Sequence, residues 1–173
     1  MGKFLITGSP GLGKSTVVRA LKRRGYQAFD SESMIGVTKL EDRATGLPAP
    51  WPAPPVDWGK YAFNWQEKGL RRLLQKNGDV FIAAAVSNQD LFYKDFDGIF
   101  VLTAGEHVIR KRLATRKKKF GKLPDELAGI LNYHAEREAG YFNQPHAIAI
   151  DANQPLEKII QIILDHAAAT HRS

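Results

Sequence analysis

The 173-residue sequence contains no cysteine and no apolar run long enough to cross a membrane. The first absence excludes disulfides and any zinc or iron–sulfur site held by cysteine thiolates. The second excludes a membrane-spanning helix, which needs about 20 consecutive apolar residues. The apolar stretch near the N-terminus, Phe4-Leu5-Ile6, does not fit a secretory signal. We therefore expect a cytoplasmic protein with no membrane partner.

Acidic residues are missing from one segment, and this segment explains the formal net charge of +7. Eight basic and no acidic side chains lie between Arg110 and Lys122, so the rest of the chain carries 7 − 8 = −1. A charge gathered in one place favours a local clamp on a polyanion over a broad surface for duplex DNA. The run 117–119 within it fits either a grip on RNA or a phosphorylated substrate, or a solvated cationic face.

Apolar runs typical of buried strands alternate along the chain with amphipathic helical patterns. The length fits one domain over residues 1–173. Strands are expected at 3–7, 26–29, 80–86, 98–102 and 146–150, and helices at 14–24, 64–76, from about 106, at 127–141 and at 156–168. This alternation predicts an α/β fold of three layers, with a parallel sheet of about five strands and helices on both faces.

One segment, 46–58, holds five of the nine prolines, so neither helix nor strand should persist there. We expect an ordered excursion over a site. Five aromatic residues lie in it or just after it: Trp51, Trp58, Tyr61, Phe63 and Trp65. Their faces would suit a flat acceptor such as a base or sugar ring, or they form the local core of the loop. Arg43 and Lys60 are nearby cations that could anchor an acceptor phosphate.

A glycine-rich motif follows the first strand and opens the first helix. It comprises Gly8, Ser9, Pro10, Gly11, Leu12, Gly13, Lys14 and Ser15, with Thr16 next, and matches the P-loop pattern at every required position. The glycines let successive N–H groups point at phosphate oxygens. Lys14 can reach the β- and γ-phosphates, Ser15 can offer its hydroxyl to Mg²⁺, and the helix directs its positive end at the nucleotide. The motif predicts binding of ATP with Mg²⁺.

Four further stretches resemble P-loop small-molecule and nucleoside monophosphate kinases, especially shikimate and gluconate kinases. They are Phe29-Asp30-Ser31-Glu32, Arg112-Leu113-Ala114-Thr115-Arg116, the pair Arg137 and Tyr141, and Asp151-Ala152-Asn153-Gln154-Pro155-Leu156. The resemblance implies an acceptor-binding segment at 30–66 and a helical lid over 106–141. It implies that Arg112, Asn153 and Pro155 contact adenine. It also implies that Arg116 brings a positive charge to the transferring phosphate. Arg112 and Arg116, four residues apart, should share a helix face.

Asp30 should emerge at the carboxyl end of the second strand, beside the P-loop strand. There it can accept a hydroxyl proton or hold a Mg²⁺-bound water, unless Asp30 or Ser31 merely caps the next helix. Glu32 is an alternative for the same role. The third strand ends in Ser87 and Asn88, without the acidic residue that such kinases often carry there to hold the magnesium shell.

The remaining motifs decide between classes of P-loop protein. The chain is short for a ring-forming ATPase, and Ser87-Asn88-Gln89-Asp90 does not supply a guanine reader. The histidines show no metal-ligand spacing and are interpreted as structural or surface residues: His107, His134, His146, His166 and His171. We expect an ATP-dependent kinase whose acceptor is a nucleoside, a nucleotide or a sugar-like alcohol. An RNA-directed kinase and a nucleotide-dependent switch or ATPase are the alternatives, and no pattern indicates an oligomeric state.

Overall fold

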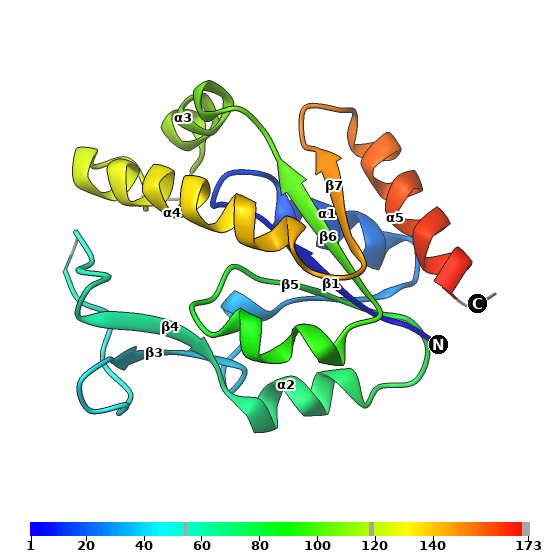
Figure 1. Ribbon diagram of the computed structural model, residues 1–173, viewed down its shortest axis with the longest axis horizontal. Helices are drawn as coiled ribbons and strands as arrows, with labels where there is room; N and C mark the ends of the chain where they lie inside the picture. Colours follow the sequence, from blue (N-terminus) through cyan, green and yellow to red (C-terminus); the bar gives the residue numbers. More distant parts are fainter. Residues whose placement is uncertain (54, 118–119, 171–173) are drawn as a thin grey trace.

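A parallel five-stranded sheet forms the centre of the molecule (Figure 1). The computed structural model describes residues 1–53, 55–117 and 120–170. The strands are β1 (Lys3–Thr7), β2 (Gln27–Asp30), β5 (Val80–Ala83), β6 (Gly98–Thr103) and β7 (Ala147–Asp151), in the order β2-β5-β1-β6-β7. All four strand pairs are parallel. The expected α/β fold with about five parallel strands is therefore confirmed.

The strands are apolar along their length because both faces of the sheet are covered. Phe4 and Ile6 pack in one apolar cluster with helices α1 (Lys14–Arg23) and α5 (Leu156–Thr170). Leu5 packs on the opposite face with α2 (Glu67–Leu74) and the 3₁₀ helix η2 (Gln89–Asp95). All three side chains are fully buried. The predicted three-layer arrangement follows from this alternation.

Two further helices connect β6 to β7. They are α3 (Glu106–Thr115) and α4 (Pro124–Phe142), which lie on the upper left of Figure 1. No helix in the described ranges combines the length and the apolar character needed to cross a membrane.

The expectation that β2 lies beside the P-loop strand is wrong. Val80 of β5 pairs with Lys3 of β1 on one side and with Gln27 of β2 on the other, so β5 separates the two. The edge position suits β2, which is only partly buried, and the central position suits β5, which is buried at all four residues. Asp30 pairs with Ala83, and β2 still ends on the same side of the sheet as the carboxyl end of the P-loop strand.

An antiparallel hairpin, which was not predicted, lies between β2 and α2. Its strands are β3 (Thr38–Asp42) and β4 (Tyr61–Trp65), at the lower left of Figure 1. The helix expected from Asn64 begins only at Glu67, because Asn64 and Trp65 pair with β3. Within the described part of 46–58 there is no helix, and the one pairing is an isolated bridge between Glu41 and Pro48.

Ser87 and Asn88 fasten this hairpin to the central sheet. The Ser87 N–H donates to the Phe63 carbonyl at 2.8 Å, and the Asn88 Oδ1 atom accepts the Trp65 N–H at 2.9 Å. The Asn88 amide also donates to the Trp65 carbonyl at 3.0 Å. The polar residues after β5 thus hydrogen-bond to strand β4 at the position where a metal-binding acid is often found in the resembling kinases. Strand β5 itself ends at Ala83, three residues earlier than expected.

Candidate active site

The P-loop adopts the strand-to-helix turn that its glycines predict. Gly8, Gly11 and Gly13 have φ values of 129°, 91° and 99°, which residues with a side chain rarely adopt. A Cβ atom on Gly8 would lie 2.4 Å from the Leu102 carbonyl oxygen of β6. No atom of the described residues lies within 4 Å of the corresponding point on Gly13, at the start of α1, so space is open there. This is a cradle that a side chain would fill, and it fits a phosphate group.

The other P-loop residues fix the loop to the core. Leu12 is buried at 2 % exposure and its N–H donates to the Ser9 carbonyl at 3.3 Å. The Gly13 carbonyl accepts the Thr16 and Val17 N–H groups and so begins α1. Thr16 is exposed and accepts a hydrogen bond from Arg19, while Pro10 is partly buried at the bend.

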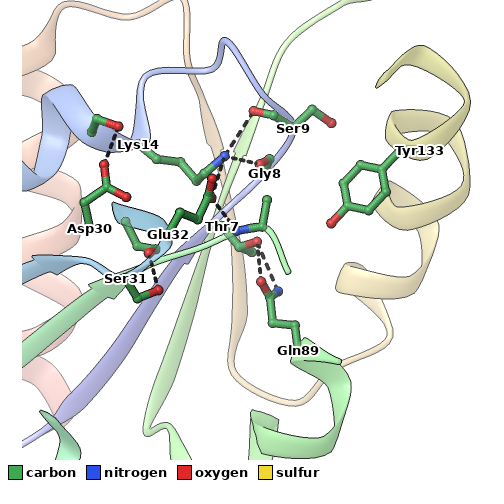
Figure 2. Close-up of polar contacts among 12 residues, drawn as sticks. Thr7, Gly8, Ser9, Lys14, Asp30, Ser31, Glu32, Gln89 and Tyr133 are labelled. Atoms are coloured by element: carbon green, nitrogen blue, oxygen red, sulfur yellow. Dashed lines mark hydrogen bonds and ion pairs between the residues drawn. The ribbon is translucent and has the colours of Figure 1, made fainter. Parts of the chain in front are cut away.

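Lys14 lies between the P-loop and a carboxylate (Figure 2). Its ammonium donates to the carbonyls of Gly8 at 2.7 Å and Ser9 at 3.3 Å. The Glu32 Oε1 atom is 3.9 Å from the same nitrogen and accepts the Ala85 N–H at 2.7 Å. Glu32 is therefore held at the carboxyl edge of the sheet, beside the group expected at the β- and γ-phosphates.

Asp30 lies beside the other chemically active P-loop residue. The Ser15 hydroxyl donates to the Asp30 Oδ2 atom at 2.6 Å. Asp30 precedes the 3₁₀ helix η1 (Ser31–Ser33), but its side chain makes no capping hydrogen bond there. The Ser31 hydroxyl also does not cap and donates instead to the Ala83 carbonyl at 2.9 Å. The geometry thus favours a site residue over a helix cap.

The residues present fit a magnesium ion bound together with phosphate. No group of three His, Asp or Glu side chains in residues 1–53, 55–117 and 120–170 forms a metal site by itself. Mg²⁺ in nucleotide sites is usually held by one or two protein oxygens, with phosphate and water supplying the rest. Ser15 and Asp30 provide such a pair of oxygens.

Arg116 follows α3, which ends at Thr115. The prediction that it shares a helix face with Arg112 is therefore wrong, because the backbone of Arg116 is already extended. Its guanidinium donates to the Phe120 carbonyl, and its Nε atom is buried with no hydrogen-bond partner among the described residues. Burial lowers the pKa of the Arg116 guanidinium, and the nearby carboxylates of Glu126 and Glu32 oppose that shift.

Arg112 and Asn153 line one groove, and their expected contact with adenine stays a prediction. The groove has a volume of about 350 Å³ and is lined by His107, Val108, Lys111, Arg112, Thr115 and Asn153. The Arg112 guanidinium is held by the Ala152 carbonyl at 2.7 Å. Pro155 is exposed and is not among the lining residues; its carbonyl instead accepts the first hydrogen bonds of α5.

The aromatic residues of the 46–66 region separate into two groups. Trp65 is buried at 2 % exposure, meets Phe92 edge-to-face and Phe96 at a tilt, and donates its indole N–H to Ser31 Oγ at 2.9 Å. It belongs to the core.

The second group forms a chain of edge-to-face contacts. Trp51 contacts Trp58 and Phe63 at ring distances of 6.3 and 5.6 Å, and Trp58 contacts Phe120 at 6.0 Å. Phe120 is next to Arg116, so this chain joins the excursion to the segment after α3.

The nearby cations serve the loop itself. Arg43 Nε donates to the carbonyls of Trp58 and Tyr61, both at 3.0 Å, and Lys60 lies over the Tyr61 ring. Arg43 therefore holds the two ends of the turn before β4 together.

The basic segment is partly neutralised. Arg110 forms an ion pair with Glu106 at 2.6 Å, and Lys117 is exposed. Lys118 and Lys119, like the side chain of Arg137, lie outside the described residues, so the expectations for the lysine run and for the Arg137 and Tyr141 pair stay predictions.

His134 is a residue that the sequence did not reveal. It was interpreted as structural or surface, yet its Nδ1 atom is 2.9 Å from the Ser9 hydroxyl of the P-loop. Tyr141, seven residues later on α4, hydrogen-bonds Thr7 at the end of β1. The spacing places both on one side of α4, but no local pattern indicates which strand that side meets.

The fold and the cradle define an α/β P-loop protein, and the fold is that of P-loop small-molecule kinases, as the resemblance implied. The chain belongs to a family described as AAA domain, whose model matches residues 3–139. That description names no substrate, reaction or assembly. No curated protein matches the sequence.

Several solved structures share the fold at low sequence identity. A shikimate kinase from Acinetobacter baumannii in complex with shikimate is 19 % identical with a TM-score of 0.60, and 96 % of this chain and 94 % of that one are covered. A gluconokinase from Sinorhizobium meliloti 1021 is 17 % identical with a TM-score of 0.59, covering 97 % and 92 %. A deoxyadenosine kinase from M. mycoides with bound dATP is 15 % identical with a TM-score of 0.59, covering 97 % and 100 %.

Proposed function

We propose that this protein is an ATP-dependent kinase that transfers the γ-phosphoryl group of ATP to a hydroxyl group of a small molecule. The observation that carries the proposal is the pair of carboxylates beside the cradle. Asp30 lies 2.6 Å from the Ser15 hydroxyl, and Glu32 lies 3.9 Å from the Lys14 ammonium. Three structures with the same fold are named as kinases, which supports the reaction class.

The P-loop and its two polar side chains hold the nucleotide. Residues 8–16 cradle the phosphates with backbone N–H groups, and Lys14 neutralises the β- and γ-phosphates. Ser15 and Asp30 hold Mg²⁺, which supplies positive charge to the phosphate oxygens. The base of ATP would be held in the groove lined by Arg112 and Asn153.

The two carboxylates have different roles in this proposal. Asp30 accepts a hydrogen bond from the hydroxyl of Ser15, and Ser15 is the expected metal ligand. We therefore assign Asp30 to the metal. Glu32 lies next to Lys14, where the γ-phosphate is expected, so we assign Glu32 as the general base. Glu32 takes the proton of the acceptor hydroxyl. At the same time the hydroxyl oxygen of the acceptor bonds to the γ-phosphorus, and the bond from that phosphorus to the ADP oxygen breaks.

A neutral hydroxyl acceptor suits this site better than a phosphate acceptor. Two carboxylates at the reaction centre would repel a second phosphate, and a phosphate needs no base. The acceptor therefore belongs to the nucleosides or the sugar-like alcohols, bound by the segment 30–66.

The segment 106–141 serves as the lid in this proposal. Arg116 is half-buried, its charge is felt by Glu32, and its Nε atom has no partner among the described residues. A buried guanidinium N–H that has no hydrogen-bond partner among the described residues is suited to the charge that develops on the transferring phosphoryl group. Closure of this segment would also exclude water, which competes with the acceptor.

The test is product analysis with γ-labelled ATP and Mg²⁺. The protein is incubated with separate pools of nucleosides, sugars, cyclitols and RNA, and labelled products are separated. Label on a small hydroxylated molecule, lost in a folded Lys14→Ala variant, is the expected result. Label released only as free phosphate would mean a switch or ATPase, and label on RNA with a steep salt dependence would mean an RNA-directed kinase.

A further inference from the structure

Helix α4 contacts the phosphate cradle through polar side chains at two places. The Ser9 hydroxyl and His134 Nδ1 are 2.9 Å apart, and the Thr7 hydroxyl and the Tyr141 hydroxyl are 3.3 Å apart. Thr7 and Ser9 flank Gly8, the residue at which β1 turns into the P-loop. α4 therefore holds the start of the cradle on both sides of its first glycine.

Three of the four side chains that form these two contacts are buried. Thr7 is 0 % exposed and Ser9 and Tyr141 are each 3 % exposed. Gln89, also at 0 %, donates to Thr7 at 3.0 Å, and Tyr133 hydrogen-bonds Tyr141 at 3.2 Å (Figure 2 shows Thr7, Gln89 and Tyr133). Buried hydroxyl and amide groups cost free energy unless their partners are correctly placed. Such a network fixes the relative position of the elements that carry it.

Ser9 links this network to the lysine of the cradle. Its side chain bonds His134, while its carbonyl accepts the Lys14 ammonium at 3.3 Å, next to the Gly8 carbonyl at 2.7 Å. The opposite side of the loop is fixed, because the backbone of Gly8 closely approaches the Leu102 carbonyl of β6. The orientation of Ser9, and with it the position from which Lys14 reaches the phosphates, is therefore set from α4.

The N-terminal end of α4 is joined to the connection between α3 and α4, which begins at Arg116. The buried Glu126 carboxylate accepts the Gly121 N–H at 2.8 Å, and a Cβ atom added to Gly121 would lie 3.3 Å from Leu113 of α3 and 3.4 Å from the Arg116 guanidinium. One helix thus contacts the connection that follows Arg116 at one end, through Glu126, and the phosphate cradle through His134 and Tyr141.

We propose that His134 is a positioning residue of the kinase site, which couples the position of α4 to the orientation of Ser9 and Lys14. It does not touch the reacting atoms. It acts through Ser9, and its loss leaves the cradle less well ordered for the phosphates. This inference deepens the proposed function and rests on its nucleotide site.

The experiment measures the dissociation constant of MgATP by calorimetry, without any acceptor. His134→Ala and Ser9→Ala are each expected to raise it by about tenfold, within the range typical of coupled sites. The double variant should be no weaker than either single one, because both remove the same hydrogen bond. His134→Asn, whose amide can replace Nδ1, should restore most of the affinity. His166→Ala, at an exposed position of α5, is the matched control and should bind like the wild type.

Thermal unfolding and far-ultraviolet circular dichroism accompany each variant. A purely structural histidine would lower the melting temperature without changing the affinity of the folded fraction. Wild-type affinity in folded His134→Ala, or additive losses in the double variant, would overturn the inference. MgATP binding that follows the expected pattern in a protein without phosphotransfer would refute the proposed function and leave the coupling supported. A wild-type protein that does not bind MgATP would refute both.

Discussion

The close approach of α2 to the loop before β3 makes Gly69→Ala the most sharply defined stability test. A Cβ atom on Gly69 would lie 2.0 Å from the Gly36 carbonyl oxygen and 2.8 Å from Val37 Cα. Real Cβ contacts stay above 3.0 Å, so the two segments must separate by about 1 Å. Both obstructing atoms belong to the backbone, so no side-chain rotation relieves the clash.

The expected cost is about 2 kcal/mol. Overpacking typically costs about 1–3 kcal/mol, and a backbone clash belongs at the upper end. Replacing a helical glycine with alanine stabilises the helix by about 1 kcal/mol, which offsets part of that cost. For a chain of this size each kcal/mol lowers the melting temperature by roughly 2–4 °C, so Gly69→Ala should lower it by about 4–8 °C.

Gly140→Ala is the matched control. It is another helical glycine, in α4, where no atom of the described side chains or backbone lies within 4 Å of the added atom. Helix propensity alone then acts, and the variant should gain about 0.5–1 kcal/mol. Differential scanning calorimetry of both variants gives the comparison. Equal or raised melting temperatures in both would refute the close packing of α2 against residues 36–37.

The remaining predictions concern the site. Glu32→Gln should lower kcat by about 10²- to 10⁴-fold with nearly unchanged MgATP affinity, whereas Asp30→Asn should be partly rescued by raised Mg²⁺; the opposite pattern in steady-state kinetics would exchange their roles. Arg116→Ala should lower kcat by about 10³-fold and affect MgATP binding less, while Lys122→Ala changes both little; equal modest losses would indicate a diffuse positive field. Trp58→Ala should raise the acceptor KM by about tenfold and Trp58→Phe much less, because stacking on the ring is retained; an unchanged KM in Trp58→Ala would mean that the aromatic chain only supports the loop.

The features that could be predicted from the sequence are those encoded by short-range patterns. The apolar run of β5 and the glycine pattern of residues 8–15 each depend on a few neighbouring residues. The placement of β5 between β1 and β2 depends on two pairings that each span more than 50 residues, and no local pattern contains them. Asp30 was expected to approach the P-loop from a neighbouring strand, and it reaches Ser15 from an edge strand instead.

The hairpin was missed for a related reason. Thr38 and Leu40 alternate with exposed or half-buried residues, as a half-buried strand requires, but its partner begins 19 positions after Asp42. Sequence signals for hairpins rely on loops of about two to five residues. The long proline-rich connection conceals the pairing, and Asn64 and Trp65 were assigned to the helix that follows them.

The strand order also has a consequence during synthesis of the chain. Lys3 pairs with Val80 of β5, and Phe4 pairs with Gly98 of β6 on the other side, so β1 has no partner strand in the sheet until β5 has been made. At translation rates of about 5–20 residues per second, the wait for β5 alone is about 4–15 s. Phe4, Leu5 and Ile6 lack their partner strands throughout that time. Slow translation between β1 and β5 therefore lengthens the period in which this apolar segment is available to chaperones and to other nascent chains.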